Sequence, residues 1–174
     1  MHKKLTILFT PVDAVGHVNA CIGLAERLRD RGHKIVFAVS KTWKEILTDY
    51  GFVVEVIEDP KAEQFKNPGE HGFANVHQAN VLVQSGVLSG ISSLEKIKII
   101  SKLNFFIEEA KNVINKEPLI KAIIDKHNPD IFIFDHFFGS PSVIYSDKPW
   151  IFLLSGNPLL VIDDERTPPG GSGK

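Results

Sequence analysis

The sequence has little cysteine and lacks a long apolar run. Cys21 is the only cysteine among 174 residues, so no disulfide can form within the chain. Its place in an amphipathic segment predicts a buried, reduced thiol, as in cytoplasmic proteins, and we expect a cytoplasmic location. No stretch approaches the roughly 18 consecutive apolar residues of a membrane helix. The apolar run after Lys3 and Lys4 is too short for a secretory signal, so we expect no membrane partner.

A large excess of charge of either sign is also missing. The formal net charge is -1, with 24% charged and 43% hydrophobic residues. Such a balance provides no broad attraction for nucleic acid or anionic lipid. We therefore expect no nucleic-acid partner, and a small molecule or another protein instead. The length suits one domain and leaves no room for a second full one.

Apolar runs alternate with segments whose apolar residues recur at helical spacing. Short continuous runs predict strands covered on both faces, and the repeating segments predict helices between them. The predicted strands are residues 5–10, 34–39, 52–57, 130–134 and 150–154, and the predicted helices begin near Val18, Trp43, Leu94 and Glu117. This order predicts an α/β fold, a single Rossmann-like, doubly wound parallel sheet domain over residues 1–162.

Glycine and proline mark where the predicted elements end. Gly32 and Gly51 are suited to close helices, and Pro118 is suited to open a new helix after a long one over residues 94–114. The apolar faces of both helices are expected to cover the sheet. Residues 58–92 lose periodicity and predict a long variable loop, and residues 163–174 have the composition of a linker-like tail.

Polar residues follow two of the predicted strands. Gly16 and His17 come after the first strand, and Asp135 and His136 come after the fourth. Ligands of an open α/β sheet bind outside the carboxyl ends of its strands, so both pairs lie where a site is expected. A histidine can accept a proton from a substrate, and a neighbouring carboxylate stabilises the cation that forms. His17 and Asp135 are the predicted pair, although His136 could face the site instead.

Several other kinds of site are disfavoured by the residues present. The turn over residues 11–17 contains only Gly16, whereas a dinucleotide-binding turn needs three glycines. Residues 139–142 lack the closing glycine of a serine nucleophile elbow, and proline occupies its open second step. His71 and His77 have no cysteine or carboxylate at a recognised ligand spacing. We therefore expect no metal site.

Six short motifs occur in a characteristic order. They are Phe9-Thr10-Pro11, Gly16-His17-Val18-Asn19-Ala20, Arg31-Gly32-His33, Pro129-Asp130, Phe134-Asp135 and Ser155-Gly156-Asn157-Pro158. As an ordered series they resemble the UDP-glycosyltransferase family, along nearly the whole chain except its variable middle. The resemblance implies an inverting enzyme made of two Rossmann-like domains, of which this chain is the N-terminal, acceptor-binding half.

The resemblance also assigns roles to residues and partners. His17 matches the catalytic base of the family, and Asp135 matches the carboxylate that orients it. A UDP-sugar is the implied donor substrate, held by a C-terminal donor-binding domain in cis or in trans. No cofactor is expected to bind this half. Because the signatures of the donor half are missing from the 174 residues, the chain alone is expected to be inactive or very weak.

The acceptor is predicted to be a small, lipophilic molecule. Binding pockets are mainly apolar with a few placed polar groups, and the predicted acceptor-binding residues are Val15, Gly16, Phe137, Phe138 and Asn157. Two other interpretations stay open, a subunit of a split glycosyltransferase and a non-catalytic module that binds small molecules. Self-association is a further alternative, because the surface meant for the donor half would be exposed.

Overall fold

The computed structural model describes residues 3–57 and 80–156, with the side chains of residues 105, 106 and 108 left out. The chain divides into two compact units, Met1–Asp59 with Glu109–Ser155, and Pro60–Glu108 with Gly156–Lys174. The first unit contains the sheet. Most of the predicted variable loop and all of the predicted tail lie outside the described residues. No helix in the described part of the chain is long and apolar enough to cross a bilayer.

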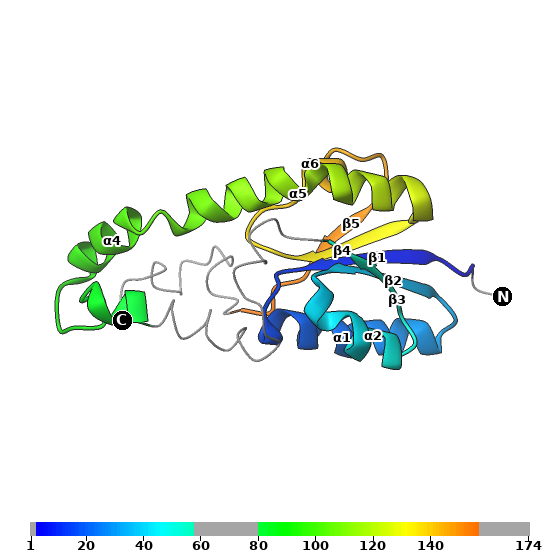
Figure 1. Cartoon of the computed structure of the whole chain (residues 1–174), viewed down its shortest axis with the longest axis horizontal. Coiled ribbons are helices and arrows are strands. Elements are labelled where there is room, and N and C mark those ends of the chain that lie inside the picture. The colour runs from blue at the N-terminus through cyan, green and yellow to red at the C-terminus, as the bar shows by residue number, and fades with distance from the viewer. Residues whose placement is uncertain (1–2, 58–79, 157–174) are drawn as a thin grey trace, which may run out of the picture. The chain divides into compact units, whose positions relative to one another are not determined.

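The centre of the first unit is a five-stranded sheet (Figure 1). The strands are β1 (Thr6–Pro11), β2 (Lys34–Val39), β3 (Val53–Val56), β4 (Ile131–Asp135) and β5 (Trp150–Phe152). They lie in the order β3-β2-β1-β4-β5, and every neighbouring pair is parallel. The predicted α/β class and parallel sheet are therefore confirmed. The strand order places β1 at the centre, between the β2 side and the β4 side.

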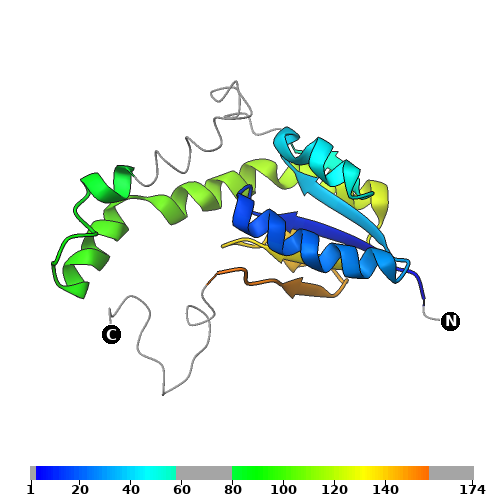
Figure 2. The same cartoon turned by 90° about the horizontal axis from the view of Figure 1, so that it is seen from below.

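Helices cover both faces of this sheet, as a doubly wound fold requires. One face carries α1 (Val15–Asp30), the 3-10 turn η1 (Lys41–Trp43) and α2 (Lys44–Asp49), and the other carries α5 (Phe105–His127) and α6 (Pro141–Ile144). Figure 1 shows the two layers, and Figure 2 looks onto the side of α1 and α2. The two layers bury most residues of β1, β2 and β4, which explains the continuous apolar runs in these three strands.

Successive strand residues belong to opposite faces of the sheet. Ile7 and Phe9 of β1 pack in the cluster that includes α1, whereas Leu8 packs in the cluster that includes α5. The same alternation occurs in β4, where Ile133 and Phe132 belong to opposite clusters. Such alternation follows from the two-residue period of a strand. It fixes the rotation of β4 and thereby the direction in which its last residue, Asp135, points.

The Arg31-Gly32-His33 motif leads from the end of α1 into β2 and contacts the residue before β1. Gly32 has φ of +88°, a left-handed conformation that glycine adopts without a steric penalty and that commonly ends a helix. His33 Nδ1 then accepts a hydrogen bond from Leu5 N at 3.1 Å. This motif therefore has a structural role, at the opposite end of β1 from Pro11.

The predicted break between the two long helices is in the wrong place. Helix α4 (Ser93–Lys102) ends before Asn104, and α5 continues through Pro118. Asn104 has φ of +52°, which interrupts a right-handed helix and which asparagine tolerates better than most residues. Proline removes one helical hydrogen bond. The helix persists beyond it because Ile120 and Ile123 are buried in the core.

The region before and within α4 also differs from the prediction. Residues 80–84 are helical rather than part of a loop. A capping box, in which Ser92 and Glu95 hydrogen-bond to each other's backbone, begins α4. None of the residues in α4 is buried. The second predicted helix, now the end of α5, packs on the sheet through Ile120 and Ile123, as predicted.

Cys21 is fully buried in α1, beneath the sheet. Burial, with a smaller contribution from the charge of Asp135, raises the pKa of its thiol from 9.0 to about 12. At pH 8 this lowers the thiolate fraction about a thousandfold. We therefore expect a thiol-disulfide exchange reagent to leave the native chain unlabelled for hours and to label it fully in denaturant. Rapid stoichiometric labelling of the native chain would contradict this burial.

Candidate functional site

The strand order creates a topological switch point between β1 and β4. From β1 the chain crosses through α1 to β2, whereas β4 leads through α6 to β5 on the other side. The register pairs Pro11 with Asp135, so the two strands end side by side. Loops leave such a point in opposite directions and open a crevice at the carboxyl edge of the sheet. The side chains that follow β1 and β4 therefore meet at this edge.

Two hydrogen bonds to other parts of the fold hold the segment that connects β1 to α1. Val12 N donates to the backbone oxygen of Asp135 at 2.8 Å, which extends the contact between β1 and β4. The indole Nε1 of Trp43 donates to Asp13 Oδ1 at 2.5 Å. Ala14 then precedes the first residue of α1 without a side-chain cap. This path places His17 in the first turn of α1, directly over the end of β4.

His17 and Asp135 lie in close contact at this edge. His17 Nδ1 lies 2.9 Å from Asp135 Oδ1, and the side chains are 26% and 3% exposed, respectively. A carboxylate at this distance favours the tautomer with the proton on Nδ1. The lone pair is then on Nε2, for which no hydrogen bond occurs within the described residues. The pair consequently has the arrangement of a base and the group that orients it.

Ser155, which was not among the predicted site residues, also contacts His17. Its Oγ lies 2.9 Å from His17 Nδ1. Pairing between β4 and β5 continues beyond Phe152, since Leu153 N donates to Phe134 O at 2.8 Å, and this brings Ser155 toward the end of β4. The rule that sites form at the carboxyl ends of strands could have identified it. The motif that contains Ser155 does not by itself indicate a chemical role for the serine.

His136 has a different environment from its neighbour Asp135. Its Nδ1 accepts a hydrogen bond from Phe138 N at 3.3 Å, and its Nε2 lies 3.9 Å from Glu109 Oε2. Burial, followed by the charges of Lys116 and His17, lowers the pKa of His136 from 6.5 to about 4. His136 is therefore neutral at pH 7 and stabilises the turn that presents Phe137. It is Asp135, and not His136, that contacts His17.

The lowered pKa of His136 predicts a loss of stability in weak acid. Between pH 6.5 and about 4 the unfolded chain takes up a proton at this residue and the folded chain does not, so the free energy of unfolding falls as pH falls. The full difference is on the order of 3 kcal/mol. This contribution to stability should be fully present above pH 6.5, should be lost by about pH 4 and should be absent in His136→Asn. Chemical denaturation of both proteins from pH 7 to 4 measures it, and parallel curves would contradict it.

Most of the predicted acceptor-binding residues surround His17. Phe137 is 48% exposed, and its ring lies edge-on to the His17 ring with centroids 6.4 Å apart. Val15 is 53% exposed and Phe138 is 37% exposed. A Cβ atom added to Gly16 would have no heavy atom within 4 Å, so the space beside it is open. Asn157 lies outside the described residues. His17 therefore has exposed apolar side chains and open space next to it.

The open space at Gly16 predicts opposite effects on stability and binding. Gly16→Ala should leave stability unchanged or raise it by up to about 1 kcal/mol, because alanine favours a helix over glycine. Gly16→Leu should weaken the binding of a small apolar ligand about tenfold by occupying the space. Thermal unfolding and ligand titration measure both effects. Gly23→Ala is the matched control, since Gly23 is an exposed residue of the same helix with equally open surroundings.

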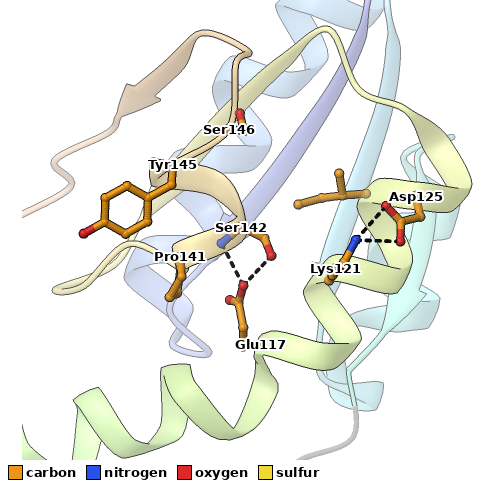
Figure 3. Close-up of a pocket in the computed structure, with 8 residues that line it drawn as sticks. Glu117, Lys121, Asp125, Pro141, Ser142, Tyr145 and Ser146 are labelled. Atoms are coloured by element: carbon orange, nitrogen blue, oxygen red, sulfur yellow. Dashed lines mark hydrogen bonds and ion pairs between the residues drawn. The ribbon is translucent and has the colours of Figure 1, made fainter.

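A second concavity, of about 360 Å³, lies between α5 and α6 and shares no lining residue with the His17 site. Figure 3 shows that its polar groups bind one another. Glu117 accepts hydrogen bonds from the hydroxyl groups of Ser140 and Ser142 and from Ser142 N. Lys121 pairs with Asp125 at 3.0 Å. The two serines therefore anchor α6 to α5, and neither has a histidine partner in this structure.

Metal-ligating groups do not cluster in the described part of the chain. Among residues 3–57 and 80–156, no three histidine, cysteine, aspartate or glutamate side chains are arranged to hold a metal ion. His71 and His77, whose spacing did not favour a metal site, lie outside these ranges.

Comparison with known proteins gives fold relatives only. No protein-family model matches the chain, and no curated protein matches its sequence. Among solved structures, the glycosyltransferase SnogD from Streptomyces nogalater has a TM-score of 0.50 and 15% identity, and covers 88% of this chain. The calicheamicin glycosyltransferase CalG4 has a TM-score of 0.50 and 16% identity, and covers 77%. The matches extend over 37% and 27% of those two chains. The described α/β domain therefore has the fold of a Rossmann-like glycosyltransferase domain.

Proposed function

We propose that this chain is the acceptor-binding domain of a UDP-sugar-dependent glycosyltransferase that acts on a small lipophilic acceptor. The observation that carries the proposal is the 2.9 Å contact between His17 Nδ1 and Asp135 Oδ1 at the switch point of the sheet. A base with a buried orienting carboxylate can deprotonate a hydroxyl group. The fold shared with SnogD and CalG4, together with the ordered motifs, favours sugar transfer among the reactions that need such a base.

In the proposed reaction, His17 Nε2 accepts the proton of the acceptor hydroxyl group. The hydroxyl oxygen attacks the anomeric carbon of the donor sugar as the bond between that carbon and the diphosphate oxygen breaks. The nucleotide diphosphate leaves with the bonding electrons on the opposite side, so a single displacement inverts the anomeric centre. His17 becomes an imidazolium, which the carboxylate of Asp135 stabilises.

The surroundings of His17 support a lipophilic acceptor. Phe137 and Val15 expose apolar side chains near the base, and Gly16 leaves open space beside it. Apolar walls with few polar groups bind apolar ligands. The reacting hydroxyl is then the group of the acceptor that needs a hydrogen-bond partner. A donor-binding domain in cis or in trans is part of the proposal, because the chain matches only about a third or less of the length of the solved glycosyltransferases.

A transfer assay with an added donor-binding domain tests the proposed function. The chain is fused to, or mixed with, the donor-binding domain of a glycosyltransferase of the same fold, and is supplied with a UDP-sugar and a lipophilic phenol. We expect a glycoside whose anomeric configuration, measured by NMR, is opposite to that of the donor. Tight binding of the phenol without transfer, unaffected by changes at His17 and Asp135, would instead favour a non-catalytic binding module.

A further inference from the structure

Two hydrogen-bonding groups converge on one ring nitrogen of His17. Asp135 Oδ1 and Ser155 Oγ each lie 2.9 Å from Nδ1. They come from neighbouring parallel strands, because β4 ends at Asp135 and Ser155 follows β5. A ring nitrogen has either one proton or one lone pair in the ring plane. The two oxygens must therefore share the one proton, or face the one lone pair, of Nδ1.

The burial of Asp135 decides which of the two states is stable. If Nδ1 had a lone pair, the Ser155 hydroxyl group could donate to it, but Asp135 Oδ1 would then face that lone pair without a proton between them. Asp135 is only 2% exposed, and its Oδ2 has no hydrogen-bond partner in the described residues. A buried carboxylate that also lost Oδ1 as an acceptor would be strongly disfavoured. Nδ1 therefore carries the proton, and Ser155 Oγ accepts it jointly with Asp135.

We propose that Ser155 is a positioning residue for His17. This proposal rests on the proposed function only for the consequence in catalysis, because both contacts with Nδ1 exist without substrate. One hydrogen bond leaves the imidazole ring free to pivot about it, and a second acceptor in a different direction restricts the pivot. The restriction directs Nε2, the proposed proton acceptor, toward one place in the crevice, and such pre-organisation favours reaction.

The position of His17 explains why a second acceptor is needed. The residue lies in the first turn of α1, and its side chain is 26% exposed. Close packing restricts a ring at a buried residue, but here the contacts are one carboxylate and the edge of Phe137. Ser155 joins the end of β5 to this ring, so α1, β4 and β5 together define the direction of the His17 ring.

NMR of the full chain with ¹⁵N-labelled histidine tests the proposal directly. The Nδ1 proton of His17 should give a resolved signal in the wild type and in Ser155→Thr, which keeps the hydroxyl group. Ser155→Ala and Ser155→Val should lose or broaden this signal, because the ring pivots and the proton exchanges faster with water. Thr and Val have nearly the same shape, so their difference isolates the hydroxyl group. Ser146→Ala removes a hydroxyl group near the start of β5 and should leave the signal unchanged.

The catalytic consequence is measured in the transfer assay. Ser155→Ala and Ser155→Val should lower kcat about tenfold, the effect of one lost hydrogen bond, with little change in KM for the acceptor. Ser155→Thr should restore kcat. An unchanged Nδ1 proton signal in Ser155→Val would overturn the positioning role. If no variant and no wild-type protein transfers sugar but the NMR differences are present, the positioning role stands and the proposed function fails.

Discussion

Replacing His17 with alanine is expected to lower kcat for sugar transfer by about a hundredfold to ten thousandfold, the usual contribution of a positioned general base. The loss should appear in kcat, because His17 acts on the proton in the transition state and contributes little to holding the acceptor. Initial rates over a range of acceptor concentrations, with saturating UDP-sugar and added donor-binding domain, separate the two parameters.

The His17→Ala protein should be less stable than the wild type by about 1 to 3 kcal/mol, because the buried carboxylate of Asp135 loses the partner of its Oδ1. Unfolding should still be a single cooperative transition, since the other contacts of His17, with Ser155 and Phe137, lie outside the core. Arg27→Ala, an exposed position on the same helix, controls for general effects on α1 and should retain full activity. Undiminished turnover in His17→Ala would remove this residue as the base.

Changing Asp135 to asparagine is expected to lower kcat by about a thousandfold while the protein remains at least as stable. The asparagine amide can donate a hydrogen bond to His17 Nδ1, which moves the ring proton to Nε2 and blocks the atom proposed to accept the substrate proton. Stability should not fall, because a neutral amide costs less to bury than a carboxylate whose Oδ2 has no partner among the described residues. Thermal unfolding and kcat, measured on the same preparation, check the two parts.

Asp130 provides a matched control at the opposite end of β4. Its Oδ2 accepts from Thr6 N at 2.9 Å, and its Oδ1 binds Lys3 Nζ at 3.0 Å, interactions that hold its pKa below the usual range. Asp130→Asn should lower the melting temperature and leave kcat unchanged, the reverse of Asp135→Asn. If both aspartates gave the same pattern, Asp135 would be a structural residue and its orienting role would be wrong.

The central strands could be predicted closely, because β1, β2 and β4 are buried between two helical layers. A run such as Ile35 to Val39 has to be apolar at every residue when two helical layers cover it, and no helix gives that pattern at this length. The position of the helix break was mispredicted because a local signal and tertiary packing disagree. Pro118 is a strong local signal, but burial of Ile120 and Ile123 outweighs it, and the turn forms at Asn104. Local propensity loses where tertiary packing opposes it.

Asp135 could be found in the sequence because it directly follows an apolar strand, and His17 because it lies shortly after the first one. Ser155 also follows a predicted strand and belongs to one of the ordered motifs, but a serine by itself indicates no role, so only its contact with His17 identified it. His136 differs from Asp135 by one residue along the chain, yet it hydrogen-bonds to the backbone of its own turn. Which of two consecutive polar residues faces a site depends on the rotation of the strand, and alternating burial in β4 determines that rotation.

The sequence by itself determined the class of fold, the ends of the strands and the residue types available at each end. Hydrophobic periodicity encodes these properties locally, so they can be known before any two segments meet. Only the tertiary structure decided that β1, β4 and β5 are neighbours, that Asp135 and Ser155 share one nitrogen of His17, and that Gly16 and Phe137 leave space around it. Strand order depends on how the layers pack, and contacts between residues more than a hundred positions apart depend on that packing alone.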